Sequence, residues 1–152
     1  GRLVLGSVTA ADAVAALAQL LRLDCKRHLI SGALAGITGQ CLVRRLCEGC
    51  RREVEPGTLP QAQRDSFPET PPKTYAAGEC PRCHRTGYSG RTGVFEVLPI
   101  GDALREAILR GAGEAELRTL ALSAGFVPLR QDGLRQVAAG VTSIEEVLRA
   151  TA

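Results

Sequence analysis

Two short Cys-x-x-Cys pairs constrain this chain more than any other feature. The first pair is Cys47 and Cys50, in "LCEGC", and the second is Cys80 and Cys83, in "ECPRC". Two residues between paired thiols form a tight turn that aims both sulfurs at one ion, and a tetrahedral zinc site takes four such ligands. The long segment between the pairs is no obstacle, because the entropy of loop closure grows slowly with length. The sequence therefore predicts a zinc site at these four cysteines.

Redox Cys-x-x-Cys motifs, or buried cysteines without a ligand, would give the same pattern, and both alternatives stay open. Four thiolate ligands leave zinc no open position for water, so we expect a structural rather than a catalytic ion. His84, beside Cys83, is a weaker substitute ligand and otherwise a solvated loop residue. Cys25 and Cys41 have no paired partner, so we expect them to be small core residues.

Composition and charge fit an ordinary soluble protein of 152 residues, with 45% apolar and 23% charged residues. The net charge of +3 is too small to indicate a nucleic-acid or membrane partner. The longest apolar run, "AVAALAQLLRL", is interrupted by Gln19 and Arg22 and is too short to span a membrane. The N-terminus also lacks the pattern of a secretory signal. We therefore expect a cytoplasmic, reducing compartment, where paired cysteines hold metal more often than they form disulfides.

The start of the chain predicts one strand and two helices. The segment "RLVLGSV" is apolar and β-branched, as in a buried strand. Thr9 and Asp12 match a capping box, and apolar residues recur at helical spacing after it, which predicts an amphipathic helix over 10–22. A second helix is expected over 26–34.

The remainder of the chain predicts a loose middle and a helical end. Repeated prolines over 53–78 break any helix or central strand. After the second cysteine pair, "GYSGRTG" predicts a glycine-rich turn and "VFEVLPI" a strand. Four helices are expected to follow and to form a compact bundle. They begin near Asp102, Glu114, Leu129 and Thr142, the last with a capping box completed by Glu145.

A group of arginines surrounds the first cysteine pair: Arg44, Arg45, Arg51 and Arg52. This group is either a solvated basic edge or a contact with an acidic surface on another protein. Nucleic acid is a poorer fit, because bases are commonly held by aromatic stacking and only Tyr75 and Tyr88 are near the site. We therefore expect no nucleic-acid partner.

Three segments resemble the C-terminal portion of the secretion ATPases that power type II secretion and type IV pilus assembly: "GQCLVRRLCEGC", "GECPRCHRTGYSGRTGVFEVLPI" and "DGLRQVAAGVTSIEEVLRAT". The resemblance implies a mixed α/β (α+β) fold. Residues 1–46 would end a RecA-like ATPase core, 47–92 would be a tetracysteine zinc-binding excursion, and 93–152 would be a strand followed by an α-helical subdomain.

The same resemblance implies a cytoplasmic, hexameric motor that lies at the inner membrane without inserting into it. Its partners would be neighbouring ATPase subunits and an inner-membrane platform protein, which the motor moves by hydrolysing ATP. Structural zinc is the cofactor expected here, and ATP with magnesium is expected only in a complete family member.

The chain departs from the family's nucleotide chemistry in several places. It contains no phosphate loop of the form Gly-x-x-x-x-Gly-Lys-Ser/Thr. The last seven positions of the family's histidine box, S-T-L-H-T-N-D-A, fall on residues 7–13 and place Thr9 where the histidine is expected. Cys41 likewise stands where the family has an arginine, and a thiol cannot stabilise phosphate charge as arginine does. We therefore predict no catalytic and no nucleotide-binding residue in this chain, and interpret Thr9 and Asp12 as a helix cap.

The leading hypothesis is a C-terminal segment of a secretion or pilus-assembly motor, in which zinc fixes the surface that transmits movement. The alternative is a stand-alone, catalytically inactive paralogue that acts as a zinc-dependent protein-interaction module. A phosphate loop upstream of the segment would distinguish the two.

Overall fold

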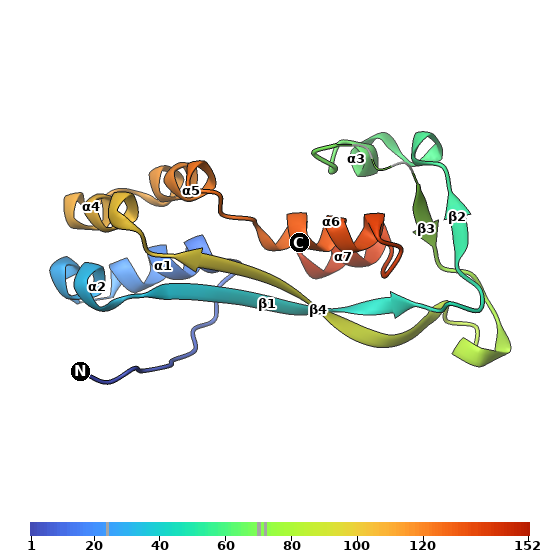
Figure 1. Ribbon diagram of the computed structural model, residues 1–152, viewed down its shortest axis with the longest axis horizontal. Helices are drawn as coiled ribbons and strands as arrows, with labels where there is room; N and C mark the ends of the chain where they lie inside the picture. Colours follow the sequence, from blue (N-terminus) through green and yellow to red (C-terminus); the bar gives the residue numbers. More distant parts are fainter. Residues whose placement is uncertain (24, 70, 72) are drawn as a thin grey trace. The chain divides into compact units, whose positions relative to one another are not determined.

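The computed structural model describes residues 1–23, 25–69, 71 and 73–152. The chain folds into two compact units. Unit 1 contains residues 1–39 and 96–127, and unit 2 contains residues 40–95 and 128–152. Two long strands, β1 (Gly36–Leu46) and β4 (Tyr88–Pro99), carry the chain from one unit to the other and pair in a two-stranded sheet (Figure 1).

The pairing of β1 with β4 is antiparallel. At one end the N–H of Ile100 donates to the carbonyl of Ala35, and at the other the N–H of Cys47 donates to the carbonyl of Gly87. β4 includes residues 88–93 of the segment "GYSGRTG", and Gly87 precedes the strand. The predicted glycine-rich turn is therefore wrong over residues 88–93, which belong to the strand paired with β1, although Gly90 has a φ of +77° within it.

Unit 1 contains the helices α1 (Ala13–Arg22), α2 (Arg27–Ala33), α4 (Asp102–Arg110) and α5 (Glu114–Ser123). Its core is formed by fully buried aliphatic side chains, among them Leu17, Leu98, Ile108 and Leu117. α1 packs on α5 and α2 packs on α4. Arg105 of α4 also donates hydrogen bonds to the carbonyls of Ser31 and Leu34, at the end of α2.

The start of α1 is set by Asp12 rather than by Thr9. The Asp12 carboxylate accepts the N–H of Ala15 at 2.7 Å, and Arg118 of α5 holds the same carboxylate at 2.9 Å. Burial raises the pKa of Asp12, but the hydrogen bonds from Arg118 and Ala15 outweigh burial and leave that pKa below its usual value. The predicted cap at Thr9 is wrong, because the first turn begins at Ala13 and Thr9 lies exposed before it.

Asp12→Ala is expected to lower the free energy of unfolding by about 1 kcal/mol, because an N–H of the first turn loses its acceptor. Thr9→Ala is expected to change it by less than the error of a urea titration. Equal losses in the two variants would show that Thr9 does cap the helix.

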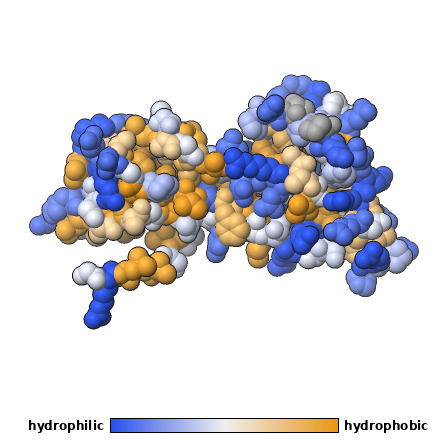
Figure 2. All heavy atoms as spheres, in the orientation of Figure 1, coloured by the Kyte–Doolittle hydropathy of each residue, from blue (hydrophilic) through white to orange (hydrophobic). Residues whose placement is uncertain are grey.

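The segment before α1 does not form the predicted strand. Leu3, Val4 and Leu5 are 85%, 82% and 89% exposed, and residues 1–11 contain no regular element. A strand needs a neighbour to take its backbone hydrogen bonds, and the sheets of the described residues, β1 with β4 and β2 with β3, do not include this segment. Its apolar residues stand as a separate orange group in Figure 2.

Unit 2 carries several short elements between the two cysteine pairs. β2 (Arg52–Val54) pairs antiparallel with β3 (Thr74–Ala76), and between them lie the 3-10 helix η1 (Pro56–Thr58) and the short helix α3 (Gln61–Arg64). The excursion expected over 53–78 thus contains local order, although its prolines keep each element short.

The four helices predicted near the end of the chain are all present. α4 and α5 belong to unit 1, whereas α6 (Leu129–Ala138) and α7 (Ile144–Ala150) belong to unit 2 and have their own apolar cluster. They therefore do not form the single bundle that we expected. Among the described residues, every helix is too short or too polar to cross a membrane.

α7 begins one residue later than its predicted capping box. Ser143 is the N-cap, and its hydroxyl accepts the N–H of Glu146 at 3.4 Å. The hydroxyl of Thr142 instead donates to the carbonyl of Arg44 at 2.8 Å. The predicted box of Thr142 and Glu145 is therefore wrong by one position.

Candidate metal centre

The two cysteine pairs lie on two turns of unit 2 that face each other. Cys47 directly follows β1 and Cys50 closes the next turn, while Cys80 caps the 3-10 helix η2 (Pro81–Cys83) and Cys83 ends it. The four Sγ atoms all lie within 4.8 Å of one another. The structure therefore brings together the four cysteines that the sequence singled out.

The separations of the sulfurs fit a tetrahedral ion. Cys47 Sγ lies 3.8 Å from Cys80 Sγ, Cys50 Sγ lies 3.7 Å from Cys83 Sγ, and the Sγ atoms of Cys80 and Cys83 are 3.6 Å apart. Four Zn–S bonds of about 2.3 Å place tetrahedral sulfurs about 3.8 Å from one another. A disulfide, by contrast, joins sulfurs about 2 Å apart. The donor set therefore fits zinc and not a pair of disulfides.

The backbone of each turn points its sulfurs inward. In the first turn the N–H groups of Cys50 and Arg51 both donate to the carbonyl of Cys47. In the second, the N–H of Gly87 donates to Cys83 Sγ at 3.2 Å. Gly87 has a φ of +75°, and a Cβ there would lie 2.6 Å from the carbonyl oxygen of Gly78, so only glycine fits.

The thiols interact too closely to ionise independently. Burial and hydrogen bonds from the other three thiols raise the pKa of Cys50 to about 12. Burial also raises the pKa of Cys83, but backbone hydrogen bonds at Cys80 and Gly87 outweigh it and bring that pKa down to about 6. Four thiolates in so small a volume repel one another, and a divalent cation removes that repulsion.

The other predicted ligands and core cysteines lie outside the cluster. His84 is exposed and is not part of the group of converging donor atoms. Cys25 is exposed, so its predicted place in the core is wrong, and Cys41 is half-buried on β1.

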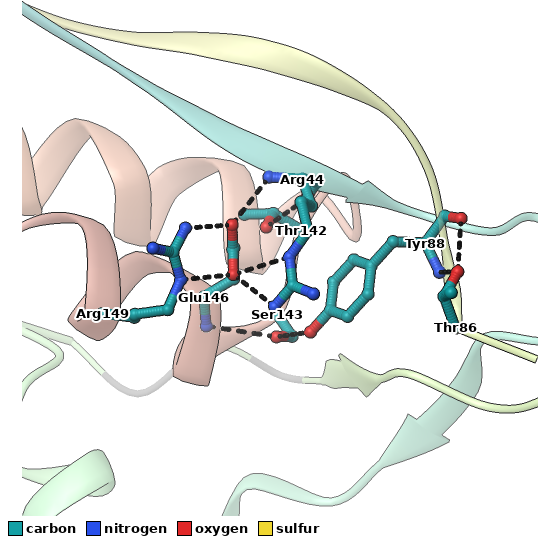
Figure 3. Close-up of polar contacts among 7 residues, drawn as sticks. All are labelled: Arg44, Thr86, Tyr88, Thr142, Ser143, Glu146 and Arg149. Atoms are coloured by element: carbon teal, nitrogen blue, oxygen red, sulfur yellow. Dashed lines mark hydrogen bonds and ion pairs between the residues drawn. The ribbon is translucent and has the colours of Figure 1, made fainter.

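A buried carboxylate beside the cysteine turns is the residue that the sequence analysis missed. The side chain of Glu146, on α7, is fully buried, and it accepts hydrogen bonds from Arg44 of β1 and Arg149 of α7 (Figure 3). The shortest contacts are 2.6 Å to Arg44 Nη2 and 2.7 Å to Arg149 Nη2, and the backbone N–H of Arg44 adds one at 3.0 Å. Hydrogen bonds from Arg149, and then from Arg44, overcome the effect of burial and lower the pKa of Glu146 to about 2.

Tyr88 links this carboxylate network to the second cysteine turn. Its ring lies under the guanidinium of Arg44, 4.0 Å from ring centroid to Cζ, and its hydroxyl lies 2.8 Å from Ser143 Oγ. Thr86 Oγ1 donates to the carbonyl of Cys83 at 2.6 Å. The same oxygen accepts the N–H of Tyr88 at 3.3 Å (Figure 3). Polar contacts thus run without a break from Cys83 to the first turn of α7.

The predicted arginine group has two kinds of members. Arg44 binds Glu146, and Arg51 donates to the carbonyl of Gly140 at 2.7 Å while lying over the ring of Tyr75. Within unit 2, Arg44 therefore links β1 to α7, and Arg51 links the first cysteine turn to the loop after α6. Arg45 and Arg52 are exposed.

Comparison with known proteins identifies the family of the chain. Residues 1–149 match the family model described as type II/IV secretion system protein. The chain belongs to this family. It is 38% identical over 151 residues to the type II secretion system protein HxcR of Pseudomonas aeruginosa and 38% identical over 151 residues to the type II secretion system ATPase E of Vibrio cholerae. It is also 37% identical over 153 residues to the type IV pilus assembly ATPase PilB of Thermus thermophilus.

These family relatives are much longer than the chain. Each alignment covers 99% of the chain, but only 29% of the P. aeruginosa protein, 30% of the V. cholerae protein and 17% of the T. thermophilus protein. The predicted resemblance to secretion and pilus-assembly ATPases is confirmed, and so is the mixed α/β character with C-terminal helices.

Proposed function

We propose that the chain is the C-terminal segment of a secretion or pilus-assembly motor ATPase and that its four clustered cysteines hold one structural zinc ion. The observation that carries the zinc assignment is the convergence of four Sγ atoms at separations that match a tetrahedral ion. The match to the secretion family over residues 1–149 supports the motor assignment.

Zinc would act here as a cross-link between two turns. Cys47, Cys50, Cys80 and Cys83 would fill its coordination positions, which leaves none for water or substrate. The residues around the ion would then serve the structure and not catalysis. They fix the turns, the strand β4 that follows them and the network around Glu146.

The purified chain is expected to contain about one zinc ion per molecule. Elemental analysis after dialysis measures this ratio directly. Cys41→Ser serves as the control, because Cys41 lies outside the cluster and its loss should leave the zinc content unchanged. Metal-free protein that is fully folded would contradict the zinc assignment.

In the complete motor, residues 1–46 would end a RecA-like core, 47–92 would form the zinc-binding excursion and 93–152 the strand and helical subdomain. Neighbouring ATPase subunits of a hexamer and the inner-membrane platform protein would be the partners, at the cytoplasmic face of that membrane. ATP and magnesium would be bound by the complete protein, because a phosphate loop and its lysine position the phosphates.

The isolated chain is expected neither to bind nor to hydrolyse ATP, since its sequence contains no phosphate loop and has Thr9 and Cys41 where the family offers histidine and arginine. Calorimetric titration with magnesium and ATP, paired with a turnover assay, tests this. Turnover by the unmodified chain would contradict the expectation. Activity gained in the double variant Thr9→His, Cys41→Arg would reveal a phosphate site within the segment.

A further inference from the structure

A polar hollow lies against the first cysteine turn. It has a volume of about 310 Å³ and is lined by Arg45, Leu46, Cys47, Glu48, Gly49, Arg82 and Ser89. Arg45 comes from the end of β1, just before the first turn, and Arg82 comes from the second turn. Arg82 reaches across to Gly49, where an added Cβ would lie 3.5 Å from its Nη1 atom.

The two arginines of the hollow are free to bind a ligand. Within the ranges that the structure describes, neither Arg45 nor Arg82 forms an ion pair or a side-chain hydrogen bond, and both are exposed. Glu48 also lines the hollow without pairing to either of them there. This separates them from Arg44 and Arg51, whose guanidinium groups are occupied by Glu146 and Gly140.

The backbone of the second turn gives an independent indication. His84 and Arg85 have φ values of +52° and +62°, the left-handed conformation that favours glycine. Both side chains are exposed, so packing does not explain why the turn carries two bulky basic residues there. Backbone strain that is kept at exposed residues points to a task for their side chains.

We infer that Arg45 and Arg82, together with the basic side chains of the second turn, form a binding surface for an acidic peptide segment of a partner protein. This inference rests on the proposed function, because the cysteine centre is what holds the two turns together. Each guanidinium presents a fork of N–H donors that matches one carboxylate. Aspartate or glutamate side chains spaced along a peptide supply such groups one at a time.

Other anionic partners fit the hollow less well. A phosphate group carries more than one negative charge at a single point, so Glu48 beside the arginines repels it more strongly than it repels one carboxylate. A nucleic acid would seek aromatic side chains to stack on, and the lining contains none. A membrane surface would favour apolar side chains beside the basic ones, and Leu46, the one aliphatic lining residue, is 4% exposed.

Binding is tested with a fluorescently labelled, glutamate-rich peptide and the zinc-loaded full chain, with anisotropy as the readout. A glutamine-rich peptide of the same length is the matched probe, and inorganic phosphate and anionic lipid vesicles are the competing ones. The glutamate peptide alone is expected to bind. Arg45→Ala and Arg82→Ala are each expected to weaken binding about tenfold, since each removes a charged hydrogen-bonding group.

Arg22→Ala is the control, because it removes the same charge from an exposed position at the end of α1. It is expected to leave peptide binding unchanged. Arg85→Gly provides a second test, because it should change peptide affinity and stability in opposite directions. It should weaken peptide binding and also raise the urea midpoint, because glycine relieves the left-handed backbone.

Three results would overturn the inference: equal loss of binding in Arg22→Ala, binding of phosphate or vesicles in preference to the peptide, or loss of zinc in Arg45→Ala and Arg82→Ala. The last result would mean that the arginines offset the negative charge of the metal centre. Protein that contained no zinc as purified, yet bound the peptide through both arginines, would contradict the zinc assignment and leave the peptide-binding surface standing.

Discussion

Cys80→Ser is expected to release the metal and unfold the part of unit 2 that the cysteine turns hold. Structural zinc contributes on the order of 10–16 kcal/mol of binding energy in small zinc-dependent peptides, which exceeds the stability of most single domains. The loss should spread to β2 and β3, because each of these strands is only three residues long. Unit 1 has a separate aliphatic core, formed around Leu17 and Ile108, and should stay folded.

Amide hydrogen exchange resolved by segment is the measurement that separates these two responses. Exchange should become fast over 47–92 in Cys80→Ser and stay slow in α1 and α4. Cys25→Ser is the matched control, because Cys25 is exposed and lies outside the cluster. Unchanged protection over 47–92 in the zinc-free variant would show that the turns do not depend on the metal.

Glu146→Gln is expected to lower the free energy of unfolding by about 3 kcal/mol at neutral pH. Breaking a buried charged pair typically costs about 3–5 kcal/mol, and the lower end applies because Arg44 and Arg149 keep access to water. The pH dependence identifies the cause. The pKa of Glu146 is about 2 in the folded chain and about 4.3 in an unfolded one, so its stabilising effect is complete above pH 4.3 and is lost as the pH falls toward 2.

Urea titrations at a series of pH values should therefore show a gap between wild type and Glu146→Gln that is widest near neutral pH and closes in acid. Glu145→Gln is the matched control, because Glu145 is the same residue type one position earlier and is exposed. A gap that did not vary with pH would assign the loss to altered packing and not to the charge of Glu146.

The cysteine cluster was predictable because the spacing of each ligand pair is a local feature of the sequence. Two ligands separated by two residues already lie on one turn, and only the meeting of the two turns depends on the fold. Helix positions were predictable for the same reason, since apolar spacing and terminal glycines act within a few residues. The exact first residue of a helix was not predictable. Thr9 precedes Asp12, and Thr142 adjoins Ser143, so each helix start offered two plausible caps, and tertiary contacts selected the second.

The remaining differences arise from long-range contacts. Glu146 looked like an ordinary helix residue in "SIEE", and the one available signal was that it stands three residues after Ser143, as in a capping box. Its burial depends on Arg44, which lies 102 residues earlier. The extended pairing of residues 88–93 likewise depends on β1. The division of the four helices between two units depends on their packing partners, since α4 packs on α2, α5 on α1, and α6 on α7 and β3.

The positions of the tyrosines make the two units distinguishable by spectroscopy. The chain has no tryptophan and two tyrosines, Tyr75 and Tyr88, and both belong to unit 2. Each ring lies next to a guanidinium, Arg51 beside Tyr75 and Arg44 beside Tyr88. Intrinsic tyrosine fluorescence therefore reports on unit 2 alone, while far-ultraviolet circular dichroism reports on the helices of both. A chelator added to the native chain should change the fluorescence first, with most of the helical signal intact.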